Sequence, residues 1–144
     1  MHSQRRMHGS CVSKDGDAVL LVGPPGSGKS DLVLRLLSQG FELVADDQVT
    51  IADGVVSGPP ELAGLLEVRG LGIVRLPHRS NARLVLVVDL EARTDRMPMP
   101  NHHADFHVPV IAIDAAAASA PDRIALALAC ATGRVNQVAG AFAA

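Results

Sequence analysis

The feature that most constrains the fold is a glycine-rich segment at residues 23–30, which reads G-P-P-G-S-G-K-S and matches the pattern G-x-x-x-x-G-K-[S/T] in full. The apolar run at 18–22 predicts a buried strand before it, and the amphipathic segment at 30–38 predicts a helix after it, ended by Gly40. A strand, this loop and a helix in sequence are typical of a phosphate-binding loop. The chain is therefore predicted to be an α/β domain organised around a nucleotide.

The residue types of this loop suit nucleoside triphosphate and magnesium. Glycines let successive backbone N–H groups turn toward phosphate oxygens, and the helix that follows adds the positive end of its dipole. Lys29 is placed to reach the β- and γ-phosphates, and the Ser30 hydroxyl to ligate Mg²⁺. An accidental glycine-rich turn is the alternative, which the full motif in its full context disfavours. The residues predicted to bind ATP are Gly23, Pro24, Pro25, Gly26, Ser27, Gly28, Lys29 and Ser30.

The sequence outside the loop predicts further strands and helices, and the length of 144 residues indicates a single domain. Asp53-Gly54 between two alternating segments is typical of a two-residue β-hairpin. Strands are expected at 41–45, 48–52, 55–57, 84–90 and 108–113, a strand broken by a tight loop at 66–74, and a polar surface loop at 93–107. Helices are expected at 59–65 and at 119–132.

Composition excludes several classes of protein. Aromatic residues make up 2% of the chain and the net charge is −2, so neither base stacking nor a basic face for nucleic acid is expected. No apolar run approaches the roughly 20 residues that a membrane span needs. The two cysteines, Cys11 and Cys130, are not in a C-x-x-C arrangement, which favours a reduced, cytoplasmic protein.

Two adjacent carboxylates, Asp46 and Asp47, end the strand expected at 41–45. Only one helix separates Lys29 from this strand, so the two strands can be neighbours in the sheet. One carboxylate can then face a metal ion while the other accepts a proton from an incoming hydroxyl. A simple turn that opens with Asp-Asp is the alternative.

Three further groups carry less specific signals. Glu67 and Arg69 lie two apart on a predicted strand, where they share a face next to glycines, but an ordinary exposed ion pair before a glycine turn is the preferred interpretation from the residues alone. His8 on its own is typical of a solvated side chain. The histidines at 102–107 have metal-ligand residue types without a recognised ligand spacing, and solvated histidines are the preferred interpretation.

Taken together, four segments resemble the bacterial HPr kinase/phosphorylase family. They are His8-Gly9, the loop at 23–30, the stretch at 40–47 and the stretch L-L-E-V-R-G-L-G-I-V at 65–74, which is similar to the family's signature segment. The resemblance covers residues 8–96 well. It implies a P-loop core of the phosphoenolpyruvate carboxykinase-like type, with a mixed sheet, flanking helices and a β-hairpin. It also implies a homo-oligomer, usually a hexamer.

The resemblance implies ATP and Mg²⁺ as cofactors. HPr, or a nitrogen-branch relative of HPr, is the implied protein substrate. Lys29 and the loop backbone are implied to hold the phosphates, and Ser30 and Glu67 to place magnesium.

For the side of the site that faces the acceptor serine, the resemblance implies a catalytic base and residues that support it. Asp47 is implied to be the catalytic base toward the substrate serine, supported by His8 and Asp46. Arg96 is the candidate for the family's later catalytic arginine.

The chain also departs from the family. It starts almost at the catalytic domain, so residues 1–144 are expected to form one P-loop domain without the N-terminal domain of longer members. The Pro-x-Arg-x-Gly-Arg-Asn stretch tied to phosphorolysis is replaced by the alanine-rich segment 114–122. We therefore predict a serine kinase with weak or absent phosphorylase activity. The alternatives are a small-molecule kinase on the same core and a non-catalytic nucleotide sensor.

Overall fold

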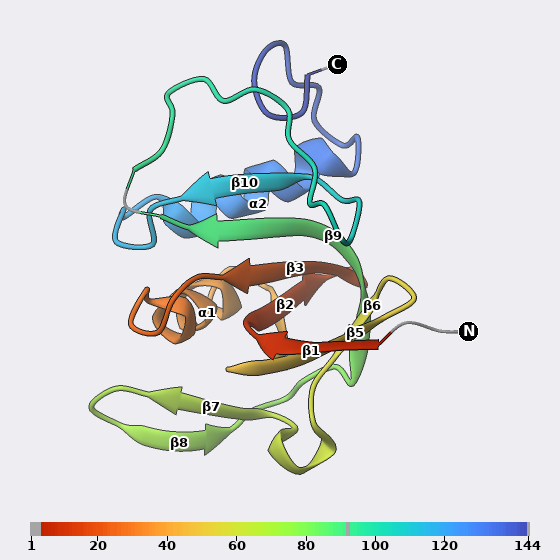
Figure 1. The fold of residues 1–144 in the computed structure, drawn as a ribbon. Helices are drawn as coiled ribbons and strands as arrows, with labels where there is room; N and C mark the ends of the chain where they lie inside the picture. Colours follow the sequence, from red (N-terminus) through yellow and green to blue (C-terminus); the bar gives the residue numbers. More distant parts are fainter. Residues whose placement is uncertain (1–3, 92, 144) are drawn as a thin grey trace.

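Three apolar strands lie side by side and run parallel to one another in the computed structural model, which describes residues 4–91 and 93–143 (Figure 1). β9 (Asn81–Leu90) lies between β3 (Asp17–Val22) and β10 (Val110–Ile113), and both pairs are parallel. Successive side chains of a strand point to opposite faces of the sheet, and β3 is apolar on both of them. This strand is therefore buried from two sides, as the apolar run at 18–22 predicted.

Antiparallel strands extend the sheet from β3 and from the first residues of β9. β2 (Ser10–Lys14) pairs with β3, and β4 (Glu42–Ala45) pairs with β2. On the other side, β6 (Val55–Ser57), β5 (Gln48–Ala52) and β1 (Gln4–His8) follow β9 in that order. Within the described residues the result is a mixed sheet of eight strands.

Both helices cover one face of this sheet (Figure 1). α1 (Lys29–Leu37) packs on β2 and β4, and α2 (Ala120–Ala131) packs on β9 and β10. The core between the helices and the sheet consists mainly of fully buried aliphatic side chains: Val12, Val19, Leu21, Leu32, Val33, Leu36, Leu43, Leu86, Val88 and Ile124. No helix in the described part of the chain is long and apolar enough to span a membrane.

The other face of the sheet is covered by the sheet itself. Val49 and Ile51 of β5 and Val56 of β6 pack against Leu20 of β3 and Val87 of β9. The sheet is curled strongly enough that β5 also contacts β2. Because of this curl, the end of β1 lies near the beginning of β2 and the end of β4. The polar residues of the site lie there.

The two predicted hairpins are present. Asp53 and Gly54 connect β5 to β6 with φ of 52° and 75°, the left-handed backbone that a two-residue type I′ turn needs. The stretch predicted as a strand broken by a tight loop is the hairpin of β7 (Leu65–Val68) and β8 (Gly72–Arg75), which packs beside α1. The loop at 93–107 contains no strand among its described residues.

Two predictions need correction, and two strands were missed. The strands that precede Lys29 and Asp46 are not neighbours, because β2 lies between β3 and β4. Neither β1 nor β2 was predicted from the sequence. The helix expected at 59–65 is only the short 3₁₀ turn η1 (Pro60–Leu62), since Gly64 takes a φ of 76° and β7 begins one residue later.

Candidate nucleotide-binding and phosphoryl-transfer site

The glycine-rich loop connects the end of β3 to the start of α1, as predicted. Gly26 and Gly28 have φ of 81° and 92°, a backbone that other residue types seldom adopt. A Cβ atom on Gly23 would lie 2.8 Å from the Ser27 hydroxyl oxygen, so the loop closes too tightly for any larger residue there. The N–H of Ser27 donates to the carbonyl of Pro24 at 3.1 Å and completes the turn. This loop has the shape of a backbone cradle for phosphate oxygens.

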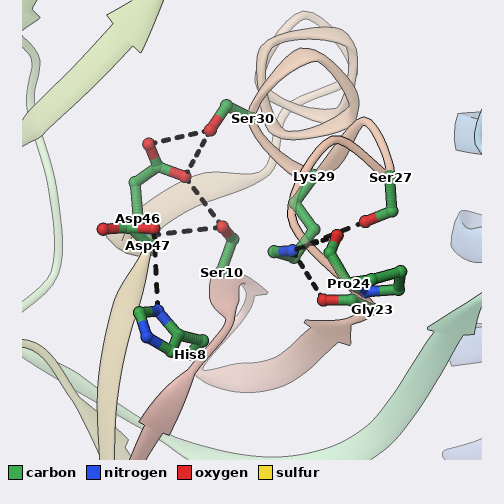
Figure 2. Close-up of polar contacts among 9 residues, drawn as sticks. All are labelled: His8, Ser10, Gly23, Pro24, Ser27, Lys29, Ser30, Asp46 and Asp47. Atoms are coloured by element: carbon green, nitrogen blue, oxygen red, sulfur yellow. Dashed lines mark hydrogen bonds and ion pairs between the residues drawn. The ribbon is translucent and has the colours of Figure 1, made fainter.

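Lys29, the first residue of α1, directs its ammonium group back into the loop (Figure 2). Its Nζ donates to the carbonyl oxygens of Gly23 and Pro24 at 2.7 and 3.1 Å, and lies 3.4 Å from the Ser27 hydroxyl. These contacts hold a full positive charge beside the cradle, where the N-terminus of α1 adds a partial one. The two charges together suit a polyphosphate anion.

Asp46 lies next to Ser30, the second residue of α1, although β2 separates their strands. The Ser30 hydroxyl is 3.0 Å from both carboxylate oxygens of Asp46. Ser10, the first residue of β2, bridges the gap because its hydroxyl donates to Asp46 Oδ1 at 2.7 Å (Figure 2). Three oxygen-bearing side chains from α1, β2 and the end of β4 therefore meet at one edge of the sheet.

Asp47 follows in a constrained backbone and points elsewhere. Its φ is 71°, a left-handed conformation that aspartate tolerates better than most residues. The N–H of Asp47 donates to the Ser10 hydroxyl at 3.3 Å, and its carbonyl accepts from the N–H of Gly9 at 3.1 Å. Its carboxylate is 70% exposed and lies 3.9 Å from His8 Nδ1. The two aspartates thus face different surroundings, one held by hydroxyls and the other open to solvent.

The donor set at Asp46 fits magnesium held together with phosphates. No group of three or more His, Cys, Asp or Glu side chains that could hold a metal ion occurs in the part of the chain described by the structure. Magnesium, however, usually binds through one or two carboxylates, water and substrate phosphates rather than in an all-protein cage. The oxygens of Ser30 and Asp46, next to the phosphate cradle, provide that kind of incomplete shell.

Two predicted site residues are not drawn into this cluster. Glu67 lies exposed on β7, and Arg96 lies exposed in the loop between β9 and β10. Neither makes a hydrogen bond or an ion pair with the described residues. Their roles toward magnesium and phosphate stay predictions.

The polar loop at 93–107 contacts β1 through Arg5. Arg5 forms an ion pair with Asp105 and lies 5.5 Å above the ring centroid of Phe106. His103 stacks on Phe106 with ring centroids 4.4 Å apart. His103 therefore takes part in packing beside β1.

Ser10 is the site residue that the sequence reasoning missed. It is fully buried, and it holds both aspartates, through the carboxylate of Asp46 and the N–H of Asp47. Ser10 belongs to no recognised motif, and β2, the strand that it begins, was not predicted from the sequence. Its position directly after His8-Gly9 is the only sequence signal that could have drawn attention to it.

A cavity of about 910 Å³ opens beside His8 and Asp46. Its walls are the β1–β5 ribbon on one side and residues 58–63 with 78–80 on the other. The side chains of Arg6 and Thr50, directly opposite each other in the β1–β5 pairing, are among its lining. Asp46 therefore borders this cavity on one side and contacts Ser30, at the start of α1, on the other.

Comparison with known proteins places this arrangement in one family. The family model described as HPr Serine kinase C-terminal domain matches residues 1–105. An HPr kinase/phosphorylase of Clostridium novyi is 46% identical over 78 residues, covering 51% of this chain and 25% of that protein. One from Cupriavidus metallidurans is 39% identical over 115 residues, covering 69% of this chain and 36% of that protein. The chain thus spans about a third of the length of such relatives.

A solved structure has the same fold. The structure titled Hpr(Ser) kinase/phosphatase from Coxiella burnetii superimposes with a TM-score of 0.67, covering 83% of this chain and 86% of that one at 21% sequence identity. Its likeness supports the mixed sheet with two helices and a hairpin. Because the family model covers well over half of the chain, this protein belongs to the HPr serine kinase C-terminal domain family.

Proposed function

We propose that this protein is an ATP- and Mg²⁺-dependent serine kinase that acts on HPr or on a nitrogen-branch relative of HPr. The observation that carries the proposal is the division of the aspartate pair. Asp46 is bound by the hydroxyls of Ser30 and Ser10, while Asp47 remains exposed beside them. Family membership and the names of the relatives support the choice of HPr as acceptor.

On the nucleotide side, the residues present fit ATP with magnesium. The loop backbone and Lys29 bind the β- and γ-phosphates, and Ser30 and Asp46 present oxygens to the metal. Glu67, on the neighbouring hairpin, is proposed to complete the metal's surroundings. Bound Mg²⁺ would neutralise charge on the phosphate oxygens during transfer.

On the acceptor side, Asp47 is the general base. It accepts the proton that the acceptor serine loses as its oxygen bonds to the γ-phosphorus, and the bond between that phosphorus and the bridging oxygen breaks, releasing ADP. His8, 3.9 Å away, helps to orient this carboxylate. Asp46 is less suited to the role, because the hydroxyls of Ser10 and Ser30 already contact its carboxylate oxygens.

The large cavity beside the aspartates is the proposed entry for the acceptor. His8 and Asp46 are both part of its wall. Because His8 Nδ1 lies 3.9 Å from the Asp47 carboxylate, a serine that enters there is proposed to come within reach of Asp47, as general-base catalysis requires. The cavity's volume of about 910 Å³ leaves room for more than one side chain of a protein loop.

Phosphorolysis is proposed to be weak or absent. That reaction needs inorganic phosphate held by cations or N–H donors. The segment from 114 to 118 lies against the phosphate loop, with Ala115 buried and the Asp114 carboxylate accepting from the N–H of Ala116. It presents an extra negative charge, and it carries no cationic side chain of its own.

Transfer of label from [γ-³²P]ATP to purified HPr tests this function. We expect label on an HPr serine with wild-type protein and magnesium, and none with Lys29→Ala. Tight ATP binding with no label on any acceptor would favour the nucleotide sensor instead. Label on a small molecule but not on HPr would favour the small-molecule kinase.

A further inference from the structure

The two ends of the phosphate loop are chemically different, which orients a bound nucleotide. Lys29 and Ser30 of the motif serve the β- and γ-phosphates, and Asp46 lies on their side of the loop. If the γ-phosphate lies at that end, as the proposed function requires, the nucleoside must extend from the opposite side. Apart from segment 114–118, which the proposed function connects with weak phosphorolysis, the residues on that side have no role in the phosphoryl transfer described above.

A second cavity, of about 470 Å³, borders the phosphate loop without Ser30 or Asp46 in its lining. Its lining comes from the loop residues 26–28, from Asp31 and Arg35 of α1, and from Ala115 and Ala116 after β10. The volume is within the range of about 300–1,000 Å³ usual for small-molecule sites. The cavity adjoins the loop, since residues 26–28 are part of its lining. Ala115 packs on Gly28, where an added Cβ would lie 3.3 Å from the Ala115 Cβ.

Arg35 is the most constrained side chain of this cavity. Its Nε donates to Asp31 Oδ2 at 3.0 Å, and its two terminal nitrogens donate to the carbonyl oxygens of Ala117 and Ala115. Each of the three nitrogens is therefore engaged within the plane of the guanidinium. The side chain is still 29% exposed, so it offers a ligand mainly its flat face.

Aromatic side chains, the usual partners of a nucleobase, are scarce in this chain. It has three Phe and no Trp or Tyr, and none of the residues that line the cavity is aromatic. An arginine guanidinium stacks on planar rings in their place. Such stacking tolerates any base, because every base has a π face.

We propose that this second cavity seats the nucleoside of the bound nucleotide, with the Arg35 guanidinium stacked on the base. The exposed Asp31 carboxylate accepts from the ribose hydroxyls, and Ala116 forms the opposite wall. Because no lining side chain is an Asn or Gln that could pair with a base edge, ATP and GTP bind with similar affinity. The triphosphate is bound independently, by the loop and Lys29.

Calorimetric titration of MgATP, MgGTP and magnesium tripolyphosphate into wild type and three variants, one of them a control, tests this nucleoside site. Ala116→Leu fills the cavity and is expected to weaken ATP binding at least about tenfold, the order of one lost stacking contact, while tripolyphosphate binding stays within about twofold. Arg35→Lys keeps the charge but removes the planar guanidinium group. It should therefore weaken ATP binding while leaving tripolyphosphate binding nearly unchanged. Ala118→Leu is the matched control, since Ala118 is exposed in the same segment but outside the cavity.

Three results would contradict the proposed nucleoside site. They are unchanged ATP affinity in Ala116→Leu, equal weakening of ATP and tripolyphosphate binding in that variant, or a wild-type preference for ATP over GTP of more than about tenfold. The outcome is separate from that of the proposed function. Selective loss of ATP binding in Ala116→Leu, in a protein that transfers no phosphate to HPr, would support the nucleoside site and refute the kinase.

Discussion

Ser10→Ala is expected to destabilise the protein, because Ser10 connects the two aspartates of the site. The side chain is fully buried. Its hydroxyl donates to Asp46 at 2.7 Å and accepts from the N–H of Asp47 at 3.3 Å. Alanine would remove both interactions and leave the Asp47 N–H without this acceptor in a backbone that is already left-handed.

The size of the loss follows from the kinds of hydrogen bond involved. A hydrogen bond to a charged group contributes about 1.5–3 kcal/mol to stability. Asp46 would keep its contact with Ser30, which limits the loss on that side. We therefore expect the free energy of unfolding to fall by about 2 kcal/mol, or roughly 1 M in the urea midpoint at a typical slope.

Ser13 provides a matched control on the same strand. It is also fully buried in β2, but its hydroxyl has no hydrogen-bond partner within the described residues. Removing an unsatisfied buried hydroxyl costs nothing or is mildly stabilising, so Ser13→Ala should leave stability unchanged or raise it by about 1 kcal/mol. Urea denaturation followed by circular dichroism compares the two variants. Equal effects of Ser10→Ala and Ser13→Ala would refute the role assigned to Ser10.

Lys29→Ala should keep the far-ultraviolet circular dichroism spectrum but lose ATP binding in calorimetry, because it removes the only full positive charge held inside the described phosphate loop; wild-type affinity would be inconsistent with the loop as the site. Serine-phosphorylated HPr mixed with protein, magnesium and millimolar phosphate should release little pyrophosphate, and release as fast as the forward reaction would contradict the role given to segment 114–118. Burial raises the pKa of the Cys11 thiol, so Cys11 stays protonated even at mildly alkaline pH. A native thiol titration with Ellman's reagent should therefore detect only half-buried Cys130, and Cys130→Ser should abolish the signal until the protein is unfolded.

The elements that the sequence predicted well are those with a strong local signal. The phosphate loop needs glycines at fixed spacing, so its strand and helix could be placed within a residue or two of β3 and α1. The hairpin at Asp53-Gly54 is equally local, since few other residue pairs adopt its backbone.

The elements that were missed depend on distant parts of the chain. β1 reads Q-R-R-M-H and has no apolar periodicity, because it is an edge strand that pairs only with β5 and is largely exposed. β2 is short and carries Ser10 and Ser13 among its buried residues, so its sequence resembles a polar loop. Its insertion between β3 and β4 is a choice of tertiary pairing that no local pattern encodes.

The same limit applies to the site. Adjacent Asp46 and Asp47 suggested two different roles, but only the fold reveals which carboxylate lies beside Ser30. A hydroxyl such as that of Ser10 becomes meaningful only once β2 is placed between the two strands. Residues whose function depends on non-local contacts are therefore the ones that sequence reasoning misses.

The division of labour between Asp46 and Asp47 is tested most directly by single-turnover phosphoryl transfer to HPr across a magnesium titration. Asp47→Asn should bind MgATP normally, yet transfer about 10²–10⁴-fold more slowly at every magnesium concentration, because it lacks the proton acceptor. Asp46→Asn should instead shift the magnesium requirement upward, with partial recovery at high magnesium. A magnesium shift in Asp47→Asn, together with a magnesium-independent rate loss in Asp46→Asn, would contradict the assignment and exchange the two roles.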